Sequence, residues 1–171
     1  MSEDVVCAVC GKVHARTNIE LCYKLPDAVH AIVESERKRR CRFSADAGVL
    51  DEKRFFLRGT LPLPVSGRPR PYNIGIWAEV SREAFVRTYE LWADPDQAAE
   101  PRFPGVLANT LPQQPETCGL AVLVQLEGPT TRPTFHLSAA DHPLFQEHTT
   151  GIDEHRALEY TDYSTPQVTR D

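Results

Sequence analysis

The sequence predicts an α+β fold with a largely antiparallel sheet of about four to six strands, two or three packed helices and an N-terminal cysteine knuckle. Segments with the two-residue period of strands occur in both halves of the chain, and segments with helical spacing lie before and between them. They do not follow the regular alternation of a parallel βαβ sheet. The 171 residues, 41% hydrophobic and 25% charged, suit a single domain over residues 1–171.

Residues 1–20 contain the most pointed chemical motif, a zinc-knuckle-like segment. Residues 5–14 are expected to form a short strand that turns through Cys7 and Cys10, with Gly11 free to take a positive φ. Two thiolates on a tight turn can hold one soft or borderline cation, and His14 can add a third ligand. A structural zinc site needs a fourth ligand, for which the candidates are Cys41, Cys22, His30 and His142. We assign Cys41 to the site, although spacing alone does not choose among the four.

Three interpretations of this motif stay open. The first is structural zinc, and the second is a metal-free turn whose cysteines simply pack. The third is a redox pair or an open catalytic zinc site. A thioredoxin-type pair lies between a strand and a helix, and residues 13–20 show no clear helical pattern.

A helix is expected over 27–39, where Val29, Ile32 and Val33 repeat at helical spacing after Pro26. It ends in the basic run 37–40, followed by Arg42. We interpret this run as a solvated helix end, where cations suit the helix dipole, with an anion or RNA site as the alternative.

Residues 54–61 and 73–80 are expected to pair as antiparallel strands across a proline-rich loop. In the second run, small and apolar side chains alternate with Asn73, Gly75, Trp77 and Glu79, which is the period of a half-buried strand. A helix capped by Ser81 follows and presents Phe85, Tyr89 and Trp92 on one face. We interpret this aromatic stripe as packed on the sheet, with a ligand shelf as the alternative.

The last third of the chain predicts a second hairpin and short helices. Residues 101–115 are rich in turn formers and are expected to be irregular, whereas 120–127 and 134–138 have strand character. Asp141 is placed to cap a helix that starts at Pro143. One or two short helices are expected over 144–160, and 161–171 are expected to fray.

Charge and composition exclude several function classes. The net charge of −5 disfavours nucleic acid and anionic membranes as partners. The acidic start has no signal-peptide pattern, and no apolar run reaches the length of a membrane helix. We therefore expect a cytoplasmic protein that contacts no membrane. Its five cysteines are expected to be reduced, because an odd number without a secretion signal argues against a disulfide framework.

No recognisable catalytic constellation accompanies the knuckle. The serines lie in no Gly-x-Ser-x-Gly elbow, and there is no glycine-rich phosphate loop. Asp141 and His142 are adjacent, so their side chains point apart. The leading hypothesis is a non-enzymatic binding or interaction protein with a structural zinc knuckle. One alternative is a small metal-dependent hydrolase that uses His14 or His142. A further alternative is an immunity or regulatory partner of another bacterial protein.

Segments along nearly the whole chain together resemble domain of unknown function 2199, a family of uncharacterised, mainly bacterial proteins. The resemblance rests on 7–14, 46–51, 55–59, 75–81, Trp92, 111–112, 115–117, 132–133, 141–144 and 151–152. It implies one full-length domain and places Cys7, Cys10, His14 and the Asp141–His142 pair in the family pattern. The resemblance does not include Cys22, Cys41 or Cys118. The sequence departs from that pattern at Gly48, where family members often carry a cysteine. If that cysteine completes a metal site in relatives, the resemblance implies that the site here is incomplete or uses Cys41.

Overall fold

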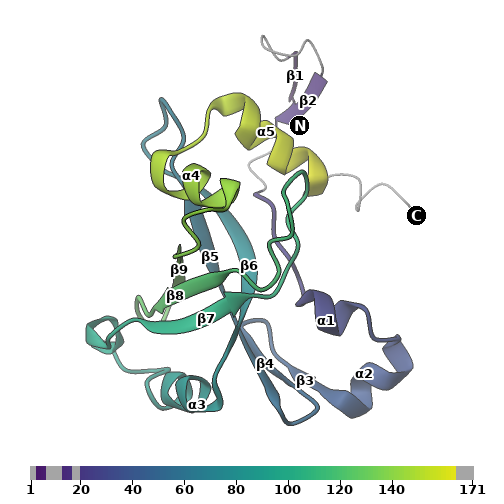
Figure 1. Ribbon diagram of the computed structural model, residues 1–171, viewed down its shortest axis with the longest axis vertical. Helices are drawn as coiled ribbons and strands as arrows, with labels where there is room; N and C mark the ends of the chain where they lie inside the picture. The colour runs from purple at the N-terminus through teal and green to yellow at the C-terminus, as the bar shows by residue number, and fades with distance from the viewer. Residues whose placement is uncertain (1–2, 7–12, 17–19, 165–171) are drawn as a thin grey trace.

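A sheet of seven strands forms the centre of the fold (Figure 1). The computed structural model describes residues 3–6, 13–16 and 20–164. The sheet strands follow each other in chain order: β3 (Cys41–Phe43), β4 (Ala47–Leu50), β5 (Arg54–Leu63), β6 (Tyr72–Val80), β7 (Phe103–Leu107), β8 (Ala121–Gln125) and β9 (Thr134–Leu137). A separate antiparallel hairpin consists of β1 (Glu3–Val6) and β2 (Val13–Arg16). The α+β class is confirmed.

The predicted sheet of about four to six strands has seven, and it is not a simple antiparallel sheet, because it closes on itself. Thr60 of β5 pairs in parallel with Thr134 of β9, so the strands from β5 to β9 form a five-stranded barrel with β3 and β4 as an extension. The Thr60 amide donates to Pro133 O over 2.9 Å at this seam. Closure joins strands far apart in sequence, and a periodicity of two residues carries no information about it.

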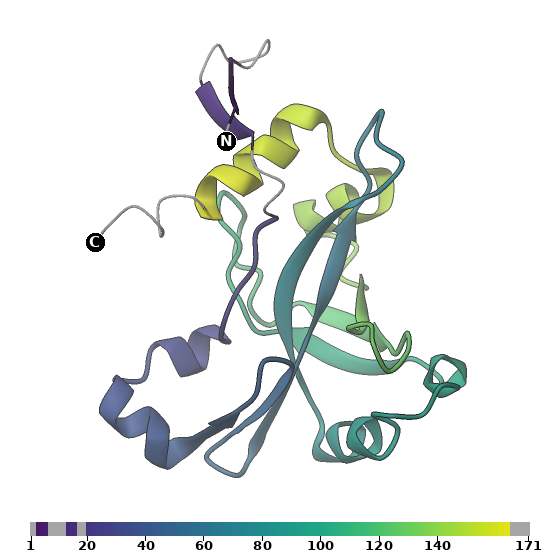
Figure 2. The ribbon, with the colours of Figure 1, turned by 180° about the vertical axis from the view of Figure 1, so that it is seen from behind.

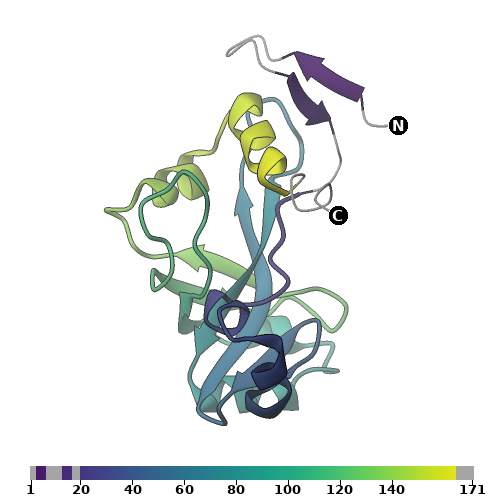
Figure 3. The same ribbon diagram turned by 90° about the vertical axis from the view of Figure 1, so that its right-hand side faces the viewer.

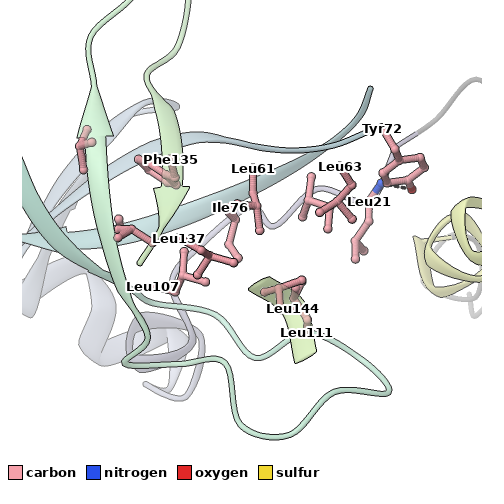
Figure 4. Close-up of a cluster of buried hydrophobic side chains, with 14 of the residues drawn as sticks. Leu21, Leu61, Leu63, Tyr72, Ile76, Leu107, Leu111, Phe135, Leu137 and Leu144 are labelled. Atoms are coloured by element: carbon pink, nitrogen blue, oxygen red, sulfur yellow. Dashed lines mark hydrogen bonds between the residues drawn. The ribbon is translucent and has the colours of Figure 1, made fainter. Parts of the chain in front are cut away.

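The barrel interior is the main core. Along β6, Ile74, Ile76 and Ala78 are fully buried, as their alternation predicts. Leu61 and Leu63 meet them from β5, and Figure 4 shows Leu61, Leu63 and Ile76 converging with residues of β7, β9 and the helix α4 (Pro143–Thr150). At one end of this core, the Tyr72 hydroxyl accepts a hydrogen bond from the Leu21 amide over 2.7 Å.

A second, smaller core covers the outer face of β5 and β6. Trp77 and Phe56 point away from the barrel and are fully buried against Val29, Leu50 and Ala108. The residues before the first helix add to this cover at its edge, and Trp77 Nε1 donates to Tyr23 O over 3.1 Å. The half-buried strand predicted over 73–80 is therefore covered on part of both faces.

Five α-helices surround the barrel in the described part of the chain, more than the two or three predicted. They are α1 (Asp27–His30), α2 (Glu34–Arg40), α3 (Arg82–Glu90), α4 (Pro143–Thr150) and α5 (Glu154–Ser164), with a short 3-10 helix, η1 (Gln97–Ala99). Figures 1 and 2 show α4 and α5 at the end that carries the β1–β2 hairpin. The extension β3–β4 and helix α2 lie at the opposite end (Figure 3). None of these helices has the length and apolar character needed to cross a membrane.

The helix predicted over 27–39 is broken at 31–33. Arg37 stabilises the break, because its Nε donates to Ile32 O and its Nη2 to His30 O, each over 2.7 Å. These carbonyls would otherwise lack the partners of a continuous helix. Only Val29 of α1 is buried, and Val33 is 65% exposed. The apolar spacing was therefore a poor guide here.

Three further details correct the sequence expectations. Residues 103–107, expected to be irregular, form β7 and pair with β6 and β8. The cap of α4 is His142 rather than Asp141, since its Nδ1 accepts from the Leu144 amide over 3.1 Å. Helix α5 continues to Ser164 with Thr161 buried, and 165–171 lie outside the described residues.

Candidate functional site

The β1–β2 hairpin frames the predicted cysteine knuckle. Val6 pairs with Val13 and Val5 pairs with His14 in antiparallel register. Cys7 and Cys10 belong to the connection 7–12, which lies outside the described residues, and of His14 the structure describes the backbone. Metal binding by these three residues stays a prediction.

Cys41, the assigned fourth ligand, lies on β3 opposite Leu50. Its thiol is free and partly buried, and burial raises its pKa. The views in Figures 1 and 3 place β3 at the other end of the molecule from the β1–β2 hairpin. Gly48 lies on the neighbouring strand, paired with Phe43, so a cysteine at this position would belong to the same distant end.

The remaining candidates for the fourth ligand are engaged elsewhere or stand apart. The exposed Cys22 accepts a hydrogen bond from Arg58 Nη2 over 2.6 Å. His142 uses Nδ1 as the helix cap, and its Nε2 lies 3.3 Å from Pro115 O. His30 ends α1. Within the part of the chain that the structure describes, no three Cys, His, Asp or Glu residues are grouped so as to hold a metal ion.

A cleft of about 400 Å³ lies between α3 with its following segment and the loop from β8 to β9. This volume falls in the range of small-molecule sites. Its lining residues are Asp46, Thr88, Trp92, Gln97, Leu126, Gly128, Pro129, Thr130, Thr131, Arg132 and Pro133. They come from four separate stretches of the chain, which the barrel and α3 bring together.

Trp92 forms an aromatic wall of the cleft. It is 41% exposed and stacks on Tyr89, with ring centroids 5.6 Å apart and an interplanar angle of 25°. Tyr89 in turn packs on Phe85, with ring centroids 5.0 Å apart. Phe85 is buried as the packing interpretation requires, but Tyr89 is 53% exposed. The outer half of the predicted stripe is thus not covered by the sheet.

Gln97 supplies a polar group with a fixed orientation. The residue is only 7% exposed, and its Nε2 donates to the carbonyls of Leu91, Trp92 and Asp94 over 3.0, 3.2 and 3.3 Å. Three acceptors around the amide nitrogen determine which end of the side chain is the oxygen. Oε1 makes no hydrogen bond to another described residue, and Gln97 is among the residues that line the cleft.

An ion pair between Asp46 and Arg132 also lines the cleft. Arg132 Nε lies 2.7 Å from Asp46 Oδ1, and both side chains are more than a third exposed. Two backbone hydrogen bonds hold Asp46 in place. The Asp46 carbonyl accepts from the Arg58 amide over 2.8 Å, and the Asp46 amide donates to Ser44 Oγ in the turn 44–46. Arg132 Nη1 and Nη2 and Asp46 Oδ2 have no further partner among the described residues.

The described residues that line the cleft include no histidine, cysteine or serine. The hydroxyl of Thr88 is used within the helix, because its Oγ1 donates to Ala84 O over 2.8 Å. Asp46 is the carboxylate of the described lining, and it is paired with Arg132.

A family model described as an uncharacterized protein conserved in bacteria (DUF2199) matches residues 6–152. The chain belongs to this family. The resemblance inferred from the sequence is confirmed. Neither the curated proteins nor the solved structures contain a match. The DUF2199 match spans both the cysteine connection and the cleft, and the family description states no activity.

Some of the segments that carry the DUF2199 resemblance meet at the cleft. Asp46, Trp92, Arg132 and Pro133 are distant in sequence and line one cavity. Sequence reasoning considered Trp92 as part of a ligand shelf but missed Gln97 and Arg132. No local signal identifies Gln97, since its burial depends on how the chain folds after α3.

Proposed function

We propose that this protein is a non-enzymatic binding domain that takes a small ligand into the cleft between α3 and the β8–β9 loop. The observation that carries the proposal is the lining itself. It combines the partly exposed Trp92, the Gln97 side chain, whose Oε1 has no partner among the described residues, and the Asp46–Arg132 pair, and its described residues include no histidine, cysteine or serine. A few convergent polar groups on an apolar, aromatic surface are typical of ligand sites.

A hydrolase that uses His14 or His142 has less support. Both ring nitrogens of His142 face protein atoms, because Nδ1 accepts from the Leu144 amide and Nε2 faces Pro115 O. A base must have a free nitrogen in reach of the substrate. His14 belongs to β2, at the end of the molecule away from α3 and the cleft (Figure 1).

The binding proposal is tested by ¹H–¹⁵N spectra during titration with a set of ring-containing fragments: aromatic acids, neutral heterocycles and monosaccharides. Trp92 lines the cleft, whereas the indole of Trp77 is buried and bonded to Tyr23 O, so it serves as an internal reference. At least one fragment is expected to shift the Trp92 indole signal and leave Trp77 unchanged. A spectrum in which no fragment moves Trp92 selectively would reject the proposal.

We propose further that the N-terminal hairpin is a structural zinc knuckle, with Cys7, Cys10 and His14 as ligands. In support, the Val6–Val13 pair makes residues 7–12 the connection of an antiparallel hairpin, the setting in which two cysteines can grip one ion. The distance of β3 from this hairpin does not favour Cys41 as the fourth ligand within one chain (Figure 3).

Elemental analysis of the purified protein tests the zinc proposal. The unmodified chain is expected to carry about one zinc per molecule, and Cys7→Ser/Cys10→Ser is expected to carry almost none. Cys118→Ser is the matched control, because this exposed cysteine lies outside the proposed ligand set. Zinc near zero in the unmodified protein would reject the proposal. Cys41→Ser should retain the metal if the fourth ligand is not Cys41.

A further inference from the structure

We infer that the ligand of the cleft is an uncharged purine or pyrimidine base, presented as a nucleoside. The inference rests on the proposed function, that this cleft binds a small molecule, and adds the chemical class of that molecule. Three properties of the lining carry it: a flat aromatic wall, a fixed hydrogen-bond acceptor and a neutralised pair of charged side chains.

The first property is the stacking surface. Trp92 stacks on Tyr89 with the rings 25° from parallel, it is 41% exposed, and it lines the cavity. An indole in a fixed orientation favours a flat ring laid against it. Nucleobases stack on such aromatic side chains because every base has a π-face.

The second property is the acceptor on Gln97. Its Nε2 is committed to three backbone carbonyls, so the amide cannot turn over to offer a donor. A ligand that covers Oε1 without donating to it would leave a buried acceptor unpaired, which is costly. The ligand therefore has to bring an N–H or O–H group on its edge. An exocyclic amine or a ring imide of a base meets this requirement, and an aromatic hydrocarbon does not.

The third property is the Asp46–Arg132 pair. It offers the two terminal nitrogens of Arg132 as donors and Asp46 Oδ2 as an acceptor, and its net charge is zero. An edge that both donates and accepts is complementary to it, as base edges are. A phosphate would gain from Arg132 but would also face the Asp46 carboxylate. The pair therefore favours the nucleoside over the nucleotide, in agreement with a chain charge of −5.

The size of the cleft limits the ligand to one base and its sugar. A volume of about 400 Å³ accommodates a single small molecule and not a strand of nucleic acid. The prolines that line it, Pro129 and Pro133, add apolar surface without further donors. The surface thus suits a free nucleoside more than a polynucleotide.

Separate titrations with adenosine, guanosine, cytidine and uridine test the inference on the full chain. At least one is expected to shift the Trp92 indole signal in a saturable way. In Trp92→Leu, where binding is followed by the backbone amide signals of the other residues that line the cleft, the affinity for that nucleoside should fall about tenfold or more, equivalent to about 1.4 kcal/mol. Tyr163→Leu is the matched control, because Tyr163 is also 41% exposed but lies on α5. The affinity of this variant for the nucleoside should equal that of the unmodified protein.

The outcomes separate this inference from the proposal beneath it. If other fragments shift Trp92 and no nucleoside does, the nucleoside class is wrong and the binding function stands. If no compound shifts the Trp92 signal, both the binding function and the nucleoside class are rejected. A nucleoside monophosphate that binds more than about tenfold tighter than its nucleoside would overturn the preference for an uncharged ligand. An equal loss in Trp92→Leu and Tyr163→Leu would overturn the placement in the cleft.

Discussion

At the scale of single residues, Asn109 is a buried polar side chain whose hydrogen-bond partners lie at the smaller core around Trp77. It is fully buried, and its Oδ1 accepts from the Trp77 amide over 3.0 Å. Its Nδ2 donates to Leu25 O and to Asp27 Oδ1, each over 2.9 Å. The side chain therefore fastens the segment before α1 to the outer face of β6. Its hydrogen-bonding capacity is well used, which makes it costly to remove.

We predict that Asn109→Ala lowers the free energy of unfolding by about 2–4 kcal/mol, because it leaves the buried Trp77 amide and Leu25 carbonyl unpaired. Urea unfolding followed by tryptophan fluorescence measures the change. Asn73→Ala is the control, since Asn73 lies near the end of β6 and is only partly buried. A loss below about 0.5 kcal/mol in Asn109→Ala would contradict this account.

His136 makes stability depend on pH. Burial lowers its pKa below the ordinary value of 6.5, and the positive charges of Arg102 and His148 act in the same direction, against Glu127. The unfolded chain therefore binds this proton first as the pH falls. The stabilising contribution of the neutral ring is present above about pH 6.5 and is lost as the pH falls through the lower folded-state pKa.

We predict that stability falls less steeply with acidification in His136→Gln than in the unmodified protein. Denaturant unfolding at about pH 7.5, 6 and 5 gives the slope for each chain. If the slope below about pH 6.5 is the same in both chains, His136 is not the responsible group.

At the scale of elements, local patterns predicted well wherever one face of an element decides its structure. The β5–β6 pair follows from the alternation around Ile74 and Ile76, and α3 begins where Ser81 accepts from the Ala84 amide. The break between α1 and α2 did not follow, because Arg37 stabilises it through contacts that no periodicity encodes. The same holds for the cleft, whose walls belong to four stretches of chain.

The start of α4 offers a test at this scale. His142 caps the helix through Nδ1, and Pro143 occupies the first turn. We predict that His142→Ala destabilises the protein by about 0.5–2 kcal/mol, whereas His142→Asn, which keeps an acceptor, loses much less. Thermal unfolding of both variants gives the comparison. Equal losses would show that packing of the ring, and not capping, is its contribution.

At the scale of the whole molecule, closure of the barrel decides where the cleft lies. The β8–β9 loop runs from Leu126 to Pro133 and enters the seam where Pro133 O accepts from the Thr60 amide. The sequence predicted both hairpins but not that β9 returns to β5. The position of Arg132 beside Asp46 depends on this return. The site could therefore not be assembled from the hairpins taken separately.

Gly59 permits this closure, and its substitution is the sharpest test of it. A Cβ at this position would lie 2.5 Å from Phe135 Cζ and 2.6 Å from Pro133 O, so β9 would have to move away from β5. We predict that Gly59→Ala destabilises the protein by about 1–3 kcal/mol. Amide exchange at Thr60 should accelerate, because its bond to Pro133 O spans the seam, and Trp92 should respond less to a bound fragment. Gly128→Ala is the control, because a Cβ there meets no atom within 4 Å. Unchanged Thr60 protection in Gly59→Ala would show that the seam does not depend on this glycine.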